Sequence, residues 1–206
     1  MLPLLENMGI PADQIQVLTP TRKGPSGTMN LNRCLQEALN PKTPDKREIL
    51  WGERLFREGD RIMQTRNDYD VVWEKEDGTV GTGMFNGDVG KITQIDPSGE
   101  WLSVDFDGRS ALYGVEQLAE LDLAYAQTVH KAQGSEYRAV VLAAMPAAQS
   151  LMVRGVLYTA LTRARELLVV VGDDAAIRSM AANDRQQRRY SGLKWRLSHE
   201  SGLHGN

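Results

Sequence analysis

The sequence is poor in the residues that build metal centres and disulfide frameworks. Its 206 residues include one cysteine, Cys34, and three histidines, His130, His199 and His204. One cysteine cannot form an internal disulfide, and three scattered histidines do not supply the ligand set of a zinc site. We therefore predict that the chain holds no metal through its own side chains.

Long hydrophobic runs are also missing. No stretch approaches the roughly 20 consecutive apolar residues that a membrane-spanning helix requires. The opening MLPLLENMG has neither the basic start nor the small-residue cleavage site of a secretory signal. These absences predict a cytoplasmic protein with no membrane partner.

The charge balance excludes a strongly basic protein. Lys and Arg number 24 against 27 Asp and Glu, which gives a formal net charge of -3. The 41% hydrophobic and 25% charged residues are typical of a globular protein. Any contact with nucleic-acid phosphates must therefore come from local cationic patches.

A phosphate-binding loop is absent as well. The nearest match, around GDVGKIT, has Phe85 in the place of the first glycine of that motif and Ile92 where a hydroxyl should reach magnesium. We interpret Gly87 and Gly90 as turn glycines. The chain by itself therefore lacks the usual means of holding a nucleoside triphosphate.

The first forty residues, by contrast, have a clear strand, loop and helix pattern. Residues 15–18 predict a short buried strand, followed by the loop TPTRKGPSGT, which is rich in Pro, Gly and hydroxyl groups. Thr28 is predicted as the N-cap of a helix that ends at Asn40-Pro41. Residues 2–8 predict one amphipathic turn of helix before the strand.

Residues 50–118 change to short alternating runs separated by turn signals such as Asp-Gly and Pro-Ser-Gly. Turns at roughly eight-to-twelve-residue intervals predict a small SH3-like β-barrel. Its aromatic side chains are expected mostly in the core, with base stacking as the alternative; they are Tyr69, Trp73, Phe85 and Trp101. The predicted strands include residues 61–65, 89–95, 101–106 and 109–115.

Helices and apolar strands alternate in the remainder. The predicted order is a helix over 124–132, a strand over 137–145, a helix over 151–165, a strand over 167–172 and a helix capped at Asp173-Asp174. This alternation predicts an α/β fold with a parallel sheet flanked by helices. We predict one discontinuous domain, residues 1–49 and 119–183, interrupted by the barrel and followed by a polar tail at 184–206.

Two segments stand out for their chemistry. TVHKAQGSE, residues 128–136, offers donors for a phosphodiester backbone and a carboxylate for a ribose, although helix capping explains the same residues equally well. LYTALTRARELLVVVG places Arg163 and Arg165 just before an apolar strand. A guanidinium there suits a transferred phosphoryl group, but cations also favour the ends of helices.

Together these segments resemble the carboxyl-terminal part of a superfamily 1 DNA helicase of the RecD-like or TraA-like kind. VLTPTRKGPSGTMNLNRCLQEALNP resembles the fourth helicase motif region, and REGDRIMQTRNDY with GMFNGDVGKI resembles the SH3-like insertion. AYAQTVHKAQGSE resembles motif V, and LYTALTRARELLVVVG resembles motif VI. The resemblance implies a RecA-like parallel sheet flanked by helices, interrupted by an inserted SH3-like β-barrel.

The resemblance also implies a nucleotide site. Arg163 matches the motif VI arginine finger that acts on the γ-phosphate. Gly134 and Glu136 would lie near the nucleotide, with Glu136 at the ribose. Lys23 and Arg22 fall where the fourth-motif region has a basic residue, and they are assigned to the nucleotide as well.

The same resemblance implies contacts to single-stranded DNA. Thr128, His130 and Lys131 match the motif V positions that face the DNA strand. Gln133 matches a position that couples the DNA site to the nucleotide site.

The implied helicase is incomplete in these residues. ATP with Mg²⁺ would act in the complete protein, held mainly by an N-terminal RecA-like domain that carries the P-loop. We therefore predict that these 206 residues hold no cofactor alone and neither hydrolyse ATP nor unwind DNA. The alternative is a free-standing nucleic-acid-binding or adaptor module without catalysis.

Overall fold

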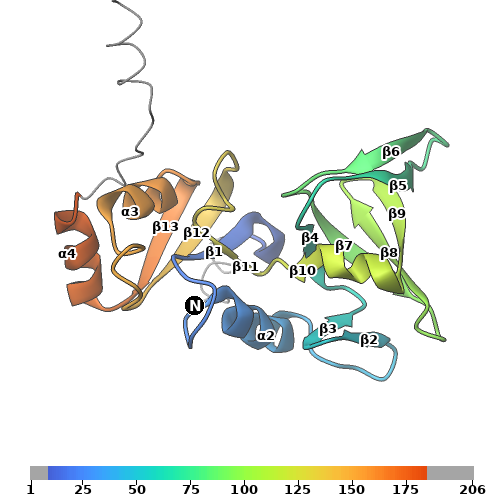
Figure 1. The fold of residues 1–206 in the computed structure, drawn as a ribbon, viewed down its shortest axis with the longest axis horizontal. Helices are drawn as coiled ribbons and strands as arrows, with labels where there is room; N and C mark the ends of the chain where they lie inside the picture. Colours follow the sequence, from blue (N-terminus) through green and yellow to red (C-terminus); the bar gives the residue numbers. More distant parts are fainter. Residues whose placement is uncertain (1–8, 185–206) are drawn as a thin grey trace, which may run out of the picture.

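The computed structural model describes residues 9–184. The helical turn predicted at residues 2–8 and almost all of the predicted tail lie outside the described residues. Within residues 9–184, no helix is long and apolar enough to cross a membrane. Figure 1 shows two sheets side by side, one flanked by helices and one made of antiparallel strands.

The first sheet is parallel and has four strands in the order β11-β1-β12-β13. They are β1 (Ile15–Thr19), β11 (Ala126–Thr128), β12 (Tyr137–Ala144) and β13 (Ala164–Gly172). Every residue of β1 is buried, as expected for an inner strand covered on both faces. The predicted parallel sheet is therefore confirmed.

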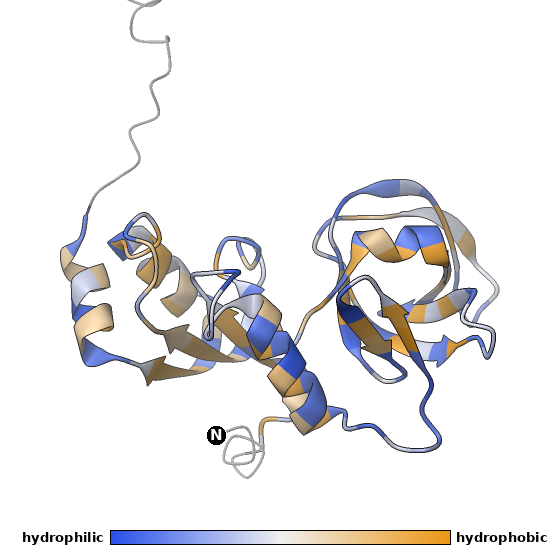
Figure 2. Cartoon of the chain, turned by 60° about the horizontal axis from the view of Figure 1, so that its bottom comes forward, coloured by the Kyte–Doolittle hydropathy of each residue, from blue (hydrophilic) through white to orange (hydrophobic). Residues whose placement is uncertain are grey.

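Helices cover the two faces of this sheet. On one face α2 (Thr28–Leu39) packs Leu31 and Leu35 against the strands. The other face is covered by α3 (Arg154–Leu161) and α4 (Asp174–Ala182). Figure 2 shows mainly hydrophobic colour on these strands and mixed colour on the helices, as amphipathic packing requires.

The predicted helix at residues 124–132 is wrong. Ala126–Thr128 instead forms strand β11, which pairs in parallel with Val17–Thr19, and turns follow it. Because a vacant sheet edge offers backbone partners to Ala126–Thr128, tertiary pairing overrides the local helical spacing of apolar residues.

Two predicted helix boundaries also need correction. The helix predicted over 151–165 is shorter, Arg154–Leu161, because β13 already begins at Ala164. Thr28 is the first helical residue rather than the N-cap, which is Gly27. A Cβ at Gly27 would lie 2.5 Å from the carbonyl oxygen of Lys23, so only glycine fits this entry to the helix.

The second sheet is antiparallel and has seven strands in the order β10-β4-β7-β8-β9-β5-β6. We call it the SH3-like sheet. Its strands are β4 (Arg61–Gln64), β5 (Asp68–Glu74), β6 (Val80–Met84), β7 (Val89–Ile95), β8 (Trp101–Phe106), β9 (Arg109–Gly114) and β10 (Leu121–Leu123). The four predicted strands are confirmed as β4, β7, β8 and β9.

The aromatic residues of the SH3-like sheet do not all lie in its core. Trp73 and Trp101 are half-buried, but Tyr69 and Phe85 are exposed and contact each other with ring centroids 5.8 Å apart. The expectation of core positions is therefore wrong for Tyr69 and Phe85. Each gains contact area from the other while both stay at the surface.

A hairpin that the sequence interpretation missed precedes this sheet. It consists of β2 (Glu48–Trp51) and β3 (Arg54–Arg57), joined by a two-residue turn at Gly52-Glu53. Gly52 has a φ of +59°, the left-handed conformation that such tight turns require. The sequence signal that could have predicted this hairpin is the dipeptide Gly-Glu between two short runs of β-forming residues.

One buried carboxylate joins the two sheets. Asp60, in the turn before β4, accepts hydrogen bonds on Oδ1 from Asn40 Nδ2 at 2.7 Å and the Tyr125 hydroxyl at 3.0 Å. Its Oδ2 accepts from Gln36 Nε2 and from the backbone N–H of Arg57. Burial raises the pKa of Asp60, and these donors oppose the rise. Helix α2, the SH3-like sheet and the approach to β11 therefore meet at one side chain.

Candidate functional site

The segment 129–136 runs from the carboxyl end of β11 to the amino end of β12. Because both strands are parallel and β1 lies between them, this segment crosses from one edge of the sheet to the other. We call these the carboxyl edge and the amino edge, and the segment the crossover. The predicted site residues divide between the two edges.

The crossover is anchored to the core by buried side chains and backbone hydrogen bonds. Val129 and Ala132 are buried in the cluster beneath α3 and α4. The amides of Lys131 and Ala132 donate to the Thr128 carbonyl, at 3.0 and 3.2 Å. Gly134 has a φ of +89°, the left-handed conformation that favours glycine in this turn. The exposed crossover side chains are therefore presented from a well-anchored backbone.

The carboxyl edge carries the residues assigned to DNA. Thr128 is half-buried at the end of β11, while His130 and Lys131 are exposed in the turn that follows. Desolvation lowers the pKa of Lys131; Asp122 opposes that change and Arg22 adds to it. Arg22, 72% exposed, lies 3.9 Å from Asp122 (Nη2 to Oδ2). These cations form a local patch in an overall acidic chain.

Arg22 and Lys23 were assigned to the nucleotide, but they lie at the carboxyl edge. Both occupy the loop that follows β1, whose Thr19 hydroxyl donates to the Ser26 carbonyl at 2.8 Å. The structure therefore places them with Lys131 and not with the residues at the amino edge.

The amino edge carries Arg163. Its guanidinium donates from Nη1 to the Ser135 carbonyl at 2.9 Å, from Nη2 to the Thr162 hydroxyl at 3.2 Å and from Nε to the Thr159 carbonyl at 3.2 Å. The half-buried side chain is therefore held in one orientation against the end of the crossover. The bond to Thr159 also satisfies a carbonyl of the last turn of α3, so capping and ligand contact are compatible roles.

Glu136 and Arg165 form an ion pair beside Arg163. Arg165 Nε lies 3.0 Å from Glu136 Oε2, and both side chains are more than half exposed. Arg165 belongs to β13 rather than to a helix end, so the helix-dipole interpretation does not apply to it. Gln133, assigned to coupling, is exposed in the crossover between the two edges.

The segment around GDVGKIT, the nearest match to a phosphate-binding loop, forms a turn followed by a strand. Gly87 has a φ of +102° in the turn before β7, which confirms it as a turn glycine. Gly90 lies inside β7 instead, where a Cβ would come within 2.6 Å of the Asp105 carbonyl oxygen. Within residues 9–184, no cluster of three or more His, Cys, Asp or Glu could hold a metal ion.

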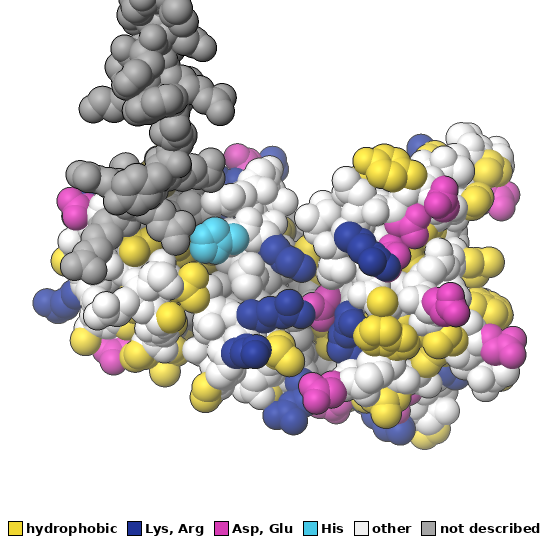
Figure 3. Space-filling model, viewed as in Figure 1, with side chains coloured by type: hydrophobic (Ala, Val, Ile, Leu, Met, Phe, Trp, Pro, Cys, Tyr) yellow, Lys and Arg dark blue, Asp and Glu magenta, His cyan; other side chains and the backbone are white. Residues whose placement is uncertain are grey.

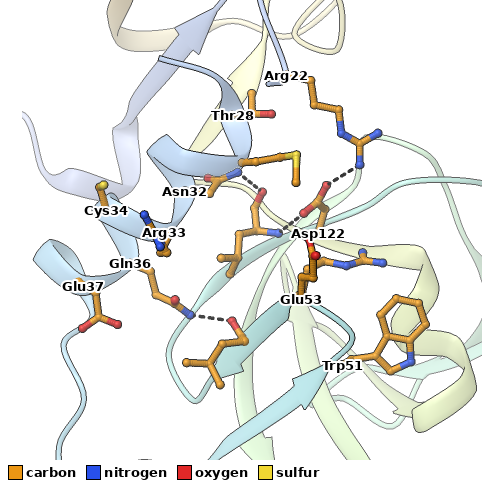
Figure 4. Close-up of a pocket in the computed structure, with 14 residues that line it drawn as sticks. Arg22, Thr28, Asn32, Arg33, Cys34, Gln36, Glu37, Trp51, Glu53 and Asp122 are labelled. Atoms are coloured by element: carbon orange, nitrogen blue, oxygen red, sulfur yellow. Dashed lines mark hydrogen bonds and ion pairs between the residues drawn. The ribbon is translucent and has the colours of Figure 1, made fainter. Parts of the chain in front are cut away.

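A pocket of about 900 Å³ adjoins the carboxyl edge. It lies between α2 and the β2–β3 hairpin, with Arg22 and Asp122 on one side and Trp51 on the other (Figure 4). The Arg54 guanidinium lies over the Trp51 ring, 4.6 Å from its centroid. The sequence interpretation assigned no role to Trp51 or Arg54, because the hairpin that brings them together was not predicted.

Comparison with known proteins agrees with the two-sheet architecture. Residues 31–106 match the family described as the ATP-dependent RecD-like DNA helicase SH3 domain, and residues 123–171 match the UvrD-like helicase C-terminal domain. The ATP-dependent RecD2 DNA helicase of Deinococcus radiodurans is 40% identical over 174 residues, 84% of this chain. This chain is a relative of the RecD-like helicases.

Other relatives support the same relation. The RecBCD enzyme subunit RecD of Mycolicibacterium smegmatis is 32% identical over 185 residues, 90% of this chain. The chain spans only 22% of the Deinococcus protein and 29% of the mycobacterial one. A chain from the structure of two coordinating Pif1 helicases at forked double-stranded DNA has the same fold, with a TM-score of 0.52 and 18% identity over 98% of this chain and 48% of that one.

Proposed function

We propose that this chain is the second RecA-like motor domain, with its SH3-like insertion, of an ATP-dependent DNA helicase of the RecD-like kind. The observation that carries the proposal is the crossover, which joins the cationic carboxyl edge to the Arg163 edge in a single anchored segment. A motor needs such a connection, because nucleotide state must change the grip on DNA.

At the amino edge, Arg163 is the proposed arginine finger. A guanidinium held by three hydrogen bonds is preorganised to stabilise the charge that develops on a γ-phosphate. Glu136 is the proposed acceptor for a ribose hydroxyl, and Gly134 provides the turn that places it. These residues fit one side of an ATP–Mg²⁺ complex, whose other side would come from an N-terminal RecA-like domain.

At the carboxyl edge, Thr128, His130 and Lys131 are the proposed contacts to single-stranded DNA, and Gln133 couples them to the amino edge. Arg22 lies close enough to Lys131 to interact with it electrostatically, and Lys23 follows Arg22 in the same loop after β1, which supports a DNA role for both instead of the nucleotide role. Figure 3 shows Lys and Arg gathered along the middle of this face, over α2 and the neighbouring part of the SH3-like sheet.

The proposal keeps the predicted division of the chain. Residues 1–49 and 119–183 would form the motor domain, residues 50–118 the insertion and residues 184–206 a tail, except that β10 pairs with β4 in the SH3-like sheet and so belongs with the insertion. The complete helicase would act in the cytoplasm.

The test supplies the missing half of the ATP site. In the Deinococcus relative, the segment that this chain matches would be replaced by the chain, and ATP hydrolysis by the fusion would be measured with and without oligo-dT. We expect DNA-stimulated hydrolysis by the fusion and none by the 206 residues alone. DNA binding without hydrolysis by a folded fusion would favour a nucleic-acid-binding module without catalysis.

A further inference from the structure

We propose that the pocket between α2 and the β2–β3 hairpin holds one base of the bound strand, stacked on the Trp51–Arg54 pair. This inference rests on the proposed function, because it extends the DNA path from the carboxyl edge. It adds a base-binding subsite to contacts that otherwise involve only the phosphate backbone.

The first argument is the stacked pair itself. Trp51 is half-buried, and its ring packs against the core of the SH3-like sheet on the pocket side of the hairpin. Arg54 is fixed over that ring at 4.6 Å and also donates from Nη1 to the Leu121 carbonyl. A planar guanidinium held in this way is a stacking surface for a nucleobase, and the indole beneath it supports the stack.

The second argument is the charge of the pocket. Its walls carry three arginines, Arg22, Arg33 and Arg54, and three acids, Glu37, Glu53 and Asp122. Glu37 is paired with Arg57, at 2.9 Å, and Asp122 faces Arg22. The charges of the walls are nearly balanced, so the pocket suits a neutral ring with polar edges better than it suits a phosphate.

The third argument is the position of the pocket. Arg22, which is 72% exposed, and Asp122 line the pocket, and both lie close enough to Lys131 at the carboxyl edge to affect its pKa. A phosphate bound by Arg22 and Lys131 therefore places the next nucleotide at the pocket. The volume of about 900 Å³ is ample for one nucleotide. Figure 4 shows Arg22 above the pocket and Trp51 on the opposite wall.

The experiment compares two oligonucleotides of equal length and charge, oligo-dT and a fully abasic oligomer. Binding of each to the whole chain would be measured by fluorescence anisotropy over a salt series. We expect the wild type to bind oligo-dT about tenfold more tightly, since one stacked base contributes roughly that factor. Trp51→Ala and Arg54→Lys should remove the preference and leave affinity for the abasic oligomer unchanged.

Matched variants separate stacking from folding. Trp51→Phe keeps an aromatic ring in the core contact and should retain part of the preference. Leu50→Ala changes the neighbouring residue of the same strand, which is 68% exposed and outside the pocket lining, and should behave as wild type. Thermal melts of each variant would confirm that the hairpin is intact.

The outcomes distinguish the two proposals. If the chain binds both oligomers with salt dependence but Trp51→Ala keeps the full preference for oligo-dT, the base pocket is wrong and the DNA role stands. If neither oligomer binds at low salt, both proposals fail. Equal affinity of the wild type for the two oligomers also overturns the base pocket.

Discussion

The two edges of the parallel sheet carry similar charges but hold them differently. At the amino edge, Arg163 makes three hydrogen bonds and Glu136 is paired with Arg165. At the carboxyl edge, the side chains of His130 and Lys131 form no hydrogen bond or ion pair within the described part of the chain. Fixed donors suit a ligand of one geometry, whereas exposed side chains without fixed hydrogen bonds suit a polymer that must be bound and released.

The connection to the SH3-like sheet differs between the edges as well. The carboxyl edge is reached through Tyr125 and the short strand β11, which follow directly on β10 of the SH3-like sheet. Asn32 of α2 clamps this approach by donating to the carbonyls of Leu123 and Ala126, at 2.9 and 3.1 Å. At the amino edge the contact is direct, because Arg61 of β4 donates from Nη1 to the carbonyls of Asp13 and Ile15, both at 3.2 Å. The SH3-like sheet therefore contacts both edges, through α2 at one and through its own strand at the other.

The largest predicted effect is a loss of ATP turnover when Arg163 at the amino edge is replaced. Arg163→Ala in the fused or complete motor should lower the ATP turnover number by about 10³-fold or more, because an arginine finger contributes at least that factor. The dissociation constant for single-stranded DNA should not change. Arg163→Lys should rescue little, since an ammonium lacks the planar fork. Arg178→Ala, an exposed arginine on α4, is the control and should keep wild-type turnover. Normal turnover in Arg163→Ala would refute the assignment.

The next largest predicted effect is a loss of stability when the buried carboxylate of Asp60 is replaced. Asp60→Asn replaces one acceptor oxygen by an NH₂ group that faces donors, so we expect a loss of about 3 kcal/mol in the free energy of unfolding. Urea titration would measure this loss. Asp70→Asn, at an exposed position of β5, should stay within about 0.5 kcal/mol of wild type. Equal stabilities for the two variants would show that Asp60 does not hold the sheets together.

A smaller effect is expected at the carboxyl edge. Lys131→Ala should weaken binding of oligo-dT and reduce the slope of log affinity against log salt by about 0.7, the value for one phosphate contact on a single strand. ATP turnover at saturating DNA should be nearly unchanged. An unaltered salt slope would mean that Lys131 does not touch a phosphate.

The smallest effect is a pH dependence at the same position. Because the pKa of Lys131 is lowered, its charge is lost at a lower pH than that of an ordinary lysine, near 10.4. Affinity for oligo-dT should therefore begin to fall as pH rises through this lowered pKa. Lys131→Arg stays charged and should bind with a flat profile over the same range. Parallel profiles for wild type and Lys131→Arg would contradict this origin.

Much of the fold could be predicted because its signals are local. The apolar runs at β1, β12 and β13 and the alternating runs at β7 and β8 define strands through their own periodicity. Asp173 was recognised as a helix cap, and its side chain accepts from the Ala175 amide at 2.7 Å.

Pairing between distant segments was harder to predict. Strand β11 has only three residues, and its conformation depends on β1, more than a hundred residues earlier. No local pattern in the sequence shows that Gln36, Asn40 and Tyr125 converge on Asp60. Tyr69 and Phe85 read as core residues because their exposure depends on how the SH3-like sheet curves.

The sequence alone therefore indicated the kind of chemistry, through the arginines at the start of β13, the polar crossover, the missing phosphate-binding loop and the resemblance to RecD-like helicases. Only the tertiary structure decided the arrangement. Arg163 lies at the amino edge, whereas Lys131 and Arg22 lie at the carboxyl edge. Trp51 and Arg54 line the same pocket. The reason is that residue type and spacing act over a few neighbours, whereas sheet order and strand direction are set by pairings between distant segments.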